Sequence, residues 1–152
     1  MEKFIAFAVS DYRLALPIAT VLQVVKCPLN PNRELSKMGL IQIGQHTIRV
    51  VDLHQQLGLE KSDQVSRPFL LITQSSSKDL SAIPVGEPPS LIEFSLERMQ
   101  QLPLSTHQPG VLAIASHAAI VSNEEATTTI FLLDLNRILN AVTPALLPTQ
   151  NS

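Results

Sequence analysis

Hydrophobic and polar residues occur in short runs along the chain, a pattern that predicts strands rather than long helices. The run FIAFAV (4–9) is apolar on both faces, a polar turn covers residues 10–13, and LALPI (14–18) follows, which predicts a hairpin of buried strands. Pro17 falls near the end of the second run, where a residue that cannot donate to a sheet is tolerated. Further strands are predicted in runs rich in apolar and β-branched residues, at 40–44, 89–95, 111–122 and 126–134.

The strand pattern occurs twice. IRVVDLHQQLG (48–58) matches IFLLDLNRILN (130–140), since each is an apolar run that stops at aspartate and continues Leu-x-x-x-Leu. The first hairpin also has a counterpart, FLLITQSSSKDLSAIPV (69–85), with a polar turn at 75–79 and Pro84 in the place of Pro17. This internal repeat predicts two similar small β units packed on each other, because neither half alone would bury enough surface.

Helices are predicted to be few and short. Candidates are the turns after Asp52 and Asp134, a turn at 33–38, and residues 96–101 with Ser95 as a possible cap. Residues 59–68 are polar and without periodicity, which predicts a connecting loop between the two copies of the repeat.

Asp52 and Asp134 are predicted to be helix N-caps, because an aspartate at this junction accepts hydrogen bonds from the free amides of the first turn. Gly58 and Asn140 then occupy the stop positions, since both residue types tolerate the left-handed conformation in which many helices end. The leucines after each aspartate are four residues apart and fall on one helical face: Leu53 with Leu57, and Leu135 with Leu139.

A second interpretation of the two aspartates is a hydrolase. Two-lobed β proteins can bring one aspartate from each lobe together as an acid/base pair that shares a proton. Such a site usually needs small residues after each aspartate, whereas bulky Leu53 and Leu135 follow here. The cap interpretation is therefore preferred, and a hydrolase using Asp52 and Asp134 stays the alternative from another functional class.

The composition favours protein–protein contacts. Charged residues make up 16% of the chain, against roughly 25% in typical soluble domains, so exposed apolar patches are expected and these mark binding surfaces. The net charge of -2, without a cluster of Lys and Arg, argues against binding to nucleic acid or anionic lipid. The single cysteine, Cys27, cannot form an internal disulfide, and no apolar run is long enough for a signal peptide or a membrane span, so a cytoplasmic protein is expected.

Metal and cofactor chemistry is not expected. A zinc site normally draws three or four ligands from Cys, His and carboxylates, and only Asp52-x-His54 has ligand spacing in this chain. There is no glycine-rich phosphate loop. The histidines are scattered and are expected on the surface: His46, His54, His107 and His117.

Over about residues 4–141 the chain resembles the CheW-like domain of bacterial chemosensory systems. The matching stretches are FIAFAVSDYRLALPI, ATVLQVVKC, GLIQIGQHTIRVVDLHQQLG and TTTIFLLDLNRIL. The resemblance implies an all-β fold of two small SH3-like five-stranded barrels packed together and interleaved along the chain, with a few short helices. It further implies one domain over 1–152, with residues 142–152 as a tail beyond the core.

The resemblance also implies a function. Members of the family are non-enzymatic adaptors, without cofactors, that couple the cytoplasmic tips of chemoreceptors to the regulatory domain of a CheA-type histidine kinase. Residue-by-residue transfer places Val21 and Gly39 at positions of receptor contact. The family's Asn-x-Arg-Gly is Gln42-Ile43-Gly44-Gln45 here, and Gln23 replaces a usual glutamate.

These two departures remove charges from the expected contact region and favour a change of partner over a change of fold. The predicted partner-binding residues are Val21, Gln23, Gly39, Gln42 and Gly44. The alternative within the binding class is a divergent adaptor of a pilus-motility or phototaxis chemosensory cluster that no longer binds receptors in the usual way.

Overall fold

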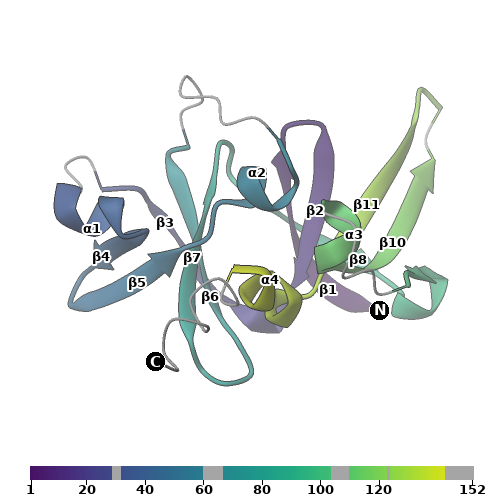
Figure 1. Ribbon diagram of the computed structural model, residues 1–152. Helices are drawn as coiled ribbons and strands as arrows, with labels where there is room; N and C mark the ends of the chain where they lie inside the picture. Colours follow the sequence, from purple (N-terminus) through teal and green to yellow (C-terminus); the bar gives the residue numbers. More distant parts are fainter. Residues whose placement is uncertain (29–31, 60–66, 104–109, 123, 143–152) are drawn as a thin grey trace.

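The computed structural model describes residues 1–28, 32–59, 67–103, 110–122 and 124–142. They form two β-sheets with a few short helices between and beside them, which confirms the expected all-β class (Figure 1). No helix in these ranges is both long and apolar enough to cross a membrane.

The two sheets have six and five strands. The six-stranded sheet has the order β8 (Ser90–Phe94), β1 (Glu2–Val9), β2 (Tyr12–Pro17), β11 (Thr127–Leu133), β10 (Ala115–Ser122) and β9 (Gln100–Gln101). The five-stranded sheet has the order β3 (Val21–Lys26), β6 (Phe69–Gln74), β7 (Leu80–Val85), β5 (His46–Val50) and β4 (Leu40–Ile43). Neighbours are antiparallel except for two parallel pairs, β2 with β11 and β5 with β7.

The sheets are open, so the closed five-stranded barrels implied by the resemblance are not observed. The edge strands β3 and β4 do not pair with each other, and neither do β8 and β9. In the five-stranded sheet, Val25 of β3 and Ile43 of β4 both pack against one apolar cluster. The two edges therefore converge through side chains rather than through backbone hydrogen bonds.

The internal repeat takes the form of an exchange of hairpins. The hairpin β1–β2 belongs to the first copy, yet it lies between β8 and β11 of the second, while β6–β7 of the second copy lies between β3 and β5 of the first. The registers agree, because Ala15 pairs with Leu132 in one sheet and Ala82 pairs with Val50 in the other. Each sheet is thus built from both halves of the sequence.

The core consists of one central cluster and two smaller ones. The central cluster draws buried side chains from both sheets and from three helices, among them Leu16, Ile83 and Ile138. The smaller clusters contain matching positions of the repeat, such as Ala15 in one and Ala82 in the other. Because the central cluster joins the two sheets, the hydrophobic driving force for folding is shared between them.

The helices are α1 (Arg33–Lys37), α2 (Leu53–Gln56), α3 (Val111–Ile114) and α4 (Leu135–Val142), with two 3₁₀ turns, η1 (Ile18–Thr20) and η2 (Leu96–Arg98). The predicted turn at 33–38 is confirmed as α1, whose N-cap is Asn32. Gly58 follows α2 with a φ of 72°, as its stop position requires.

Three local predictions were wrong. Residues 111–114 form α3 instead of a strand, because Gly110 turns the chain with a φ of 101° and Ile114 then enters the central cluster. The helix predicted at 96–101 is only the turn η2, since Ser95 makes no side-chain cap and Met99 is buried in an extended conformation. Asn140 does not end its helix, because α4 continues to Val142.

Candidate partner-binding surface

The predicted contact residues lie on or beside the two edge strands of the five-stranded sheet. Val21 and Gln23 belong to β3, while Gly39 precedes β4, Gln42 lies in β4 and Gly44 follows it. Gln23, Gln42 and Gly44 are exposed, whereas Val21 and Gly39 are half-buried. The structure thus brings these residues to the edges of one sheet, where backbone groups have no partner strand.

Two exposed apolar residues on β3 were not singled out from the sequence. Leu22 is 52% exposed and Val24 is 40% exposed, although both belong to a strand in which four of six residues are apolar. The pairing of β3 with β6 shifts register between Val21 and Gln23, so Leu22 falls at an irregularity of the ladder. The apolar composition of VLQVVK was a signal for burial, and only the edge position made these residues a surface.

Val21 is not a surface residue of this kind. Its side chain is half-buried and packs against the central cluster. A polar substitution at Val21 would therefore disturb the core as well as any contact, so Leu22 and Val24 are the better probes of this edge.

The backbone explains why position 44 carries no side chain. Gly44 begins a two-residue turn between β4 and β5 and has a φ of 61°, a left-handed value that glycine adopts without strain. A Cβ built there would meet nothing within 4 Å, so space is not the constraint. The Nε2 of Gln42 donates to the carbonyl oxygen of Gly44 at 3.4 Å, which links two predicted contact residues.

A hollow of about 650 Å³ lies beside β4. Gly39, just before β4, and Ile41 of β4 line one side of it. The other lining residues include Asp52 and Gln55 of the α2 region and Cys27 after β3. A second hollow of about 420 Å³ occupies the matching place in the other half, where Asp134 takes the role of Asp52 and Pro17 that of Pro84. The repeat therefore extends to the surface of the molecule.

The two repeated aspartates lie at helix starts. Oδ1 of Asp52 accepts a hydrogen bond from the backbone N–H of His54 at 3.0 Å, and Oδ1 of Asp134 accepts one from the N–H of Asn136 at 2.9 Å. Each aspartate also has an arginine. Nη1 of Arg67 donates to Oδ1 of Asp52 at 2.8 Å, and Nε of Arg137 lies 3.7 Å from Oδ2 of Asp134.

The surroundings of Asp52 favour the ionised form of its carboxyl group. Partial burial would raise the pKa of its carboxyl group, but the hydrogen bond and positive charge of Arg67 outweigh this, with help from the His54 N–H and the His54 ring. The net result is a lowered pKa, and the carboxylate stays ionised at neutral pH.

The geometry gives no support to a shared-proton pair. Asp52 and Asp134 line two different hollows, and each carboxylate is engaged by the amides of its own helix and by its own arginine. The lowered pKa of Asp52 comes from Arg67 and His54 and involves no second carboxylate.

The histidines are dispersed in the structure. His46 is exposed at the start of β5, His54 lies near Asp52 and Arg67, and Nδ1 of His117 is 2.8 Å from Oγ of Ser116. His107 lies outside the described residues. Within the part of the chain that is described, no three or more His, Cys, Asp or Glu side chains form a group that could hold a metal ion.

Comparison with known proteins agrees with this architecture. The family model of the CheW-like domain matches residues 3–143, and no curated protein matches the sequence. Among solved structures, the chain is similar to the scaffolding protein TtCheW from Thermoanaerobacter tengcongensis, with a TM-score of 0.68 and 19% identity over 88% of this chain and 84% of that one. At this identity the structural likeness concerns the fold. Because the family model spans nearly the whole sequence, the chain belongs to the CheW-like domain family.

Proposed function

We propose that this chain is a non-enzymatic signalling adaptor, which couples chemoreceptors to a CheA-type histidine kinase by binding the kinase's regulatory domain. The observation that carries the proposal is the exposed apolar pair Leu22 and Val24 on an edge strand of a CheW-like fold. The similar protein TtCheW is described as a scaffolding protein. A scaffold works through its outer surfaces, and it needs no catalytic cleft.

The edge of β3 has the features of a binding surface. An edge strand exposes backbone N–H and C=O groups to a partner, and apolar side chains beside them add hydrophobic contact. Natural proteins usually protect such an edge with charges, but β3 carries only Lys26, at its end. An unprotected apolar edge in a soluble fold is consistent with coverage by a partner.

The proposal is tested by disrupting this edge. The double variant Leu22→Asp/Val24→Asp should lower affinity for the purified regulatory domain of the kinase, or for a receptor tip, by more than tenfold, because charges would be buried in the contact. Binding is measured by isothermal titration calorimetry. Unchanged affinity for both partners would contradict the proposed surface, and no binding by the unaltered protein would contradict the proposed function.

The repeat supplies a matched control. Leu91 pairs with Ile5 in one sheet as Val24 pairs with Leu71 in the other, so Leu91 of β8 is the counterpart of Val24. Leu91 is 54% exposed. Leu91→Asp should leave partner affinity within about twofold of the unaltered protein, because it places the same charge at the same repeat position in the other sheet.

The uncharged character of the surface favours a second candidate, a divergent adaptor of a pilus-motility or phototaxis cluster. Gln23 and Gly44 stand where the family pattern has a glutamate and an arginine, and Gly44 is held by a left-handed turn. Binding that depends on apolar contact should hardly change between about 0.1 M and 1 M salt, whereas binding by exposed charges should weaken. Titrations with kinase and receptor domains from each type of cluster would identify the partner.

A further inference from the structure

The apolar interior of the five-stranded sheet opens into the larger hollow. Ile41 and Leu70 belong to the apolar cluster of this sheet, and Val50 and Cys27 pack against that cluster. All four residues also line the hollow of about 650 Å³. In the six-stranded sheet, the one described residue shared by the apolar cluster and the smaller hollow is Leu132. The five-stranded sheet therefore leaves more of its interior uncovered.

A difference between the two copies of the repeat explains this opening. Leu70 pairs with Pro84 in one sheet as Phe4 pairs with Pro17 in the other, so Leu70 is the counterpart of Phe4. A second aromatic ring, that of Phe94, packs against the cluster of Phe4, whereas the described residues of the other cluster include no aromatic side chain. Apolar walls without a neighbour lose packing contacts, so the hollow favours an apolar occupant.

The hollow has the size and the lining of a binding site for apolar side chains. Its volume lies within the range of about 300–1,000 Å³ that is typical of ligand pockets. Ile41, Val51 and Leu70 give it a buried apolar lining. Among the described lining residues, Asp52 is the one that carries a charge, and its carboxylate is paired with Arg67.

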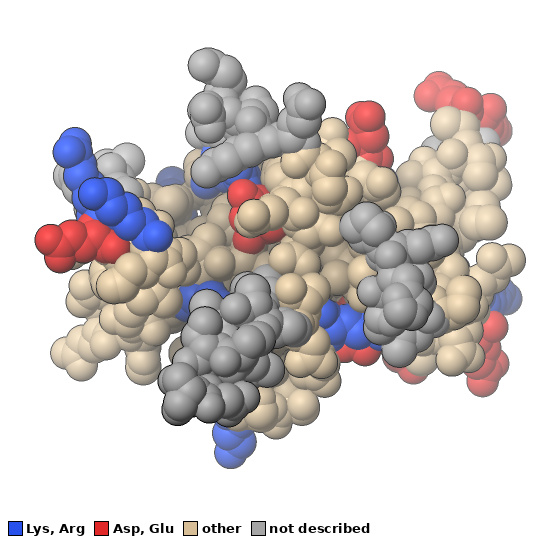
Figure 2. Space-filling model, viewed as in Figure 1, with Lys and Arg blue, Asp and Glu red and all other residues tan. Residues whose placement is uncertain are grey.

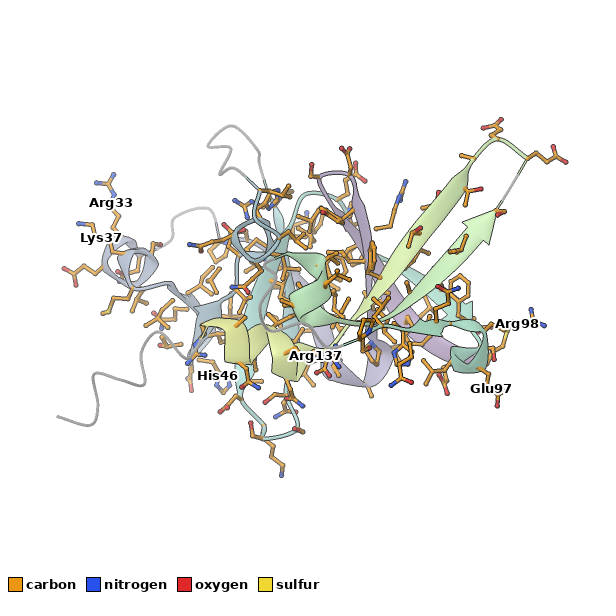
Figure 3. All side chains as sticks on the ribbon, turned by 45° about the vertical axis from the view of Figure 1, so that its right-hand side comes forward. Arg33, Lys37, His46, Glu97, Arg98 and Arg137 are labelled. Atoms are coloured by element: carbon orange, nitrogen blue, oxygen red, sulfur yellow. The ribbon has the colours of Figure 1, made fainter. Side chains whose placement is uncertain are left out.

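Helix α1 adds no charge to the hollow. Its Ser36 is a lining residue, whereas Arg33 and Lys37 are not. Figure 3 shows Arg33 and Lys37 pointing outward from α1, and Figure 2 shows the blue side chains of α1 projecting at that end of the molecule. An uncharged segment is therefore the occupant that fits the hollow.

Helix α4 leads from one hollow to the other. Asp134, which caps its start, lines the smaller hollow, and Ala141, near its end, lines the larger one. Figure 1 shows α4 running between the two sheets, from β11 toward the five-stranded sheet. The chain that leaves α4 after Val142 therefore starts at the rim of the larger hollow.

The sequence after α4 has the chemistry that the hollow requires. Residues 143–152, TPALLPTQNS, lie outside the described residues and include no charged side chain. A proline at position 144 disfavours the helical conformation for the residue before it, so the sequence favours an extended path beyond α4. Leu146 is five residues beyond Ala141, and five extended residues span about 16–18 Å. It can therefore reach into a hollow that Ala141 itself lines.

We propose that residues 143–148 dock in the larger hollow and place Leu146 and Leu147 against its apolar lining. These leucines supply the apolar volume that aromatic rings supply in the other sheet. The docking is intramolecular, so it costs the ordering of a short segment but no loss of the free motion of a second molecule. Leu22 and Val24 do not line the hollow, so the proposed partner-binding edge stays exposed when the hollow is occupied.

The single cysteine can report whether the hollow is occupied. Cys27 is half-buried and lines the hollow, so an occupant there covers its thiol. Alkylation by iodoacetamide, a small uncharged reagent, is followed by mass spectrometry of the whole protein. It should be slow in the unaltered protein and at least about tenfold faster in Leu146→Ser/Leu147→Ser, because thiol reactivity depends on access.

The same segment supplies a matched control. Gln150→Ser/Asn151→Ser also changes two neighbouring residues to serine but removes no apolar side chain, so Cys27 should react as slowly as in the unaltered protein. In concentrated urea all three proteins should react at one rate, which shows that the thiol itself is unchanged. Circular dichroism shows that each variant is folded in buffer.

A disulfide tests the placement of the segment. Ala145→Cys puts a second thiol beside the two leucines, and Asn151→Cys puts one six residues farther along the chain. With oxidised glutathione, Cys27 should form an intramolecular disulfide at position 145 at least about tenfold faster than at position 151, because a docked segment holds the first thiol nearby. Electrophoresis without reductant and peptide mapping measure both rates.

Three outcomes would overturn the proposal. The first is an equal alkylation rate in the unaltered protein and the leucine variant, and the second is an equal disulfide rate at positions 145 and 151. The third is a protection of Cys27 that disappears on dilution, because the occupant would then be a second copy of the chain. The measurements involve neither kinase nor receptor, so their failure and a failure of the adaptor role are distinguishable.

Discussion

Arg67 and Asp52 form a 2.8 Å hydrogen-bonded ion pair, which ties the segment leading into β6 to the N-cap of α2. Asp52 lies two residues after the end of β5, and Arg67 lies two residues before the start of β6. Strands β5 and β6 are the two neighbours of β7 in the sheet. The pair thus joins the end of the first copy of the repeat to the start of the second. In the second copy, the arginine that pairs with the capping aspartate is Arg137, which belongs to α4 itself.

Asparagine and alanine at position 52 should separate the cap from the ion pair. Asparagine caps a helix about as well as aspartate, so Asp52→Asn should lower the free energy of unfolding by about 0.5–1 kcal/mol through loss of the charge pair. Asp52→Ala removes both interactions and should cost about 1–2 kcal/mol. Urea denaturation measures both. Arg67→Gln should add little to Asp52→Asn, and full additivity would show that the two residues do not interact.

The same pair should make stability depend on acid pH. The pKa of Asp52 in the folded protein is lowered from its ordinary value of 3.8, so its ionised form favours folding. This contribution is complete above the unfolded pKa and is lost as pH falls through the folded one. The stability difference between the unaltered protein and Asp52→Asn should therefore be constant from neutral pH to about pH 5 and shrink below about pH 4. Urea midpoints across this range would test it, and a difference that grows in acid would contradict the sign.

The central cluster should respond equally to truncation in either copy of the repeat. Leu53 of α2 and Leu135 of α4 are 1% and 5% exposed and lie in the same cluster. Leu53→Ala and Leu135→Ala should each lower the free energy of unfolding by about 2–5 kcal/mol, because each leaves a cavity. Leu91→Ala, at an exposed position, should stay within about 0.5 kcal/mol. Thermal and urea unfolding should remain single transitions, since the cluster joins both sheets.

The exchange of hairpins predicts that neither half of the sequence folds by itself. A fragment ending at Leu59 contains β3, β4 and β5 but lacks β6 and β7, which link them into a sheet. A fragment starting at Arg67 likewise lacks β1 and β2. Each should give the circular dichroism and NMR spectra of an unfolded chain, and mixing them should restore the native spectrum. Independent folding of either fragment would contradict the pairing.

The turn at Gly44 should be sensitive to backbone strain rather than to size. Gly44→Ala should cost about 1–2 kcal/mol, because its φ of 61° is unfavourable for a residue with a Cβ. Gly44→Asn should cost less, since asparagine tolerates this conformation better. Gln45→Ala, at the next position, serves as the control and should be nearly neutral in urea denaturation. Equal costs for alanine and asparagine would point to a steric cause.

Much of the local structure followed from the sequence. Apolar runs separated by polar turns predicted the hairpins β1–β2 and β6–β7, and the aspartates marked the starts of α2 and α4. These features depend on neighbouring residues only, since a cap or a tight turn is satisfied within a few positions of the chain. The errors arose where a contact distant in sequence outweighed the local pattern. Residues 111–114 were predicted as a strand but form a helical turn, in which Ile114 packs into the central cluster.

The sequence by itself determined that the chain is a duplicated β pattern with two capped helices and few charges, because repeat, cap and composition are properties of the chain alone. Only the tertiary structure decided which strands pair, since hydrogen bonds between strands depend on what burial brings together and not on sequence order. The exchange of hairpins placed β3 at an open edge and exposed Leu22 and Val24 there. Those surfaces exist because of long-range packing, and no local pattern encodes them.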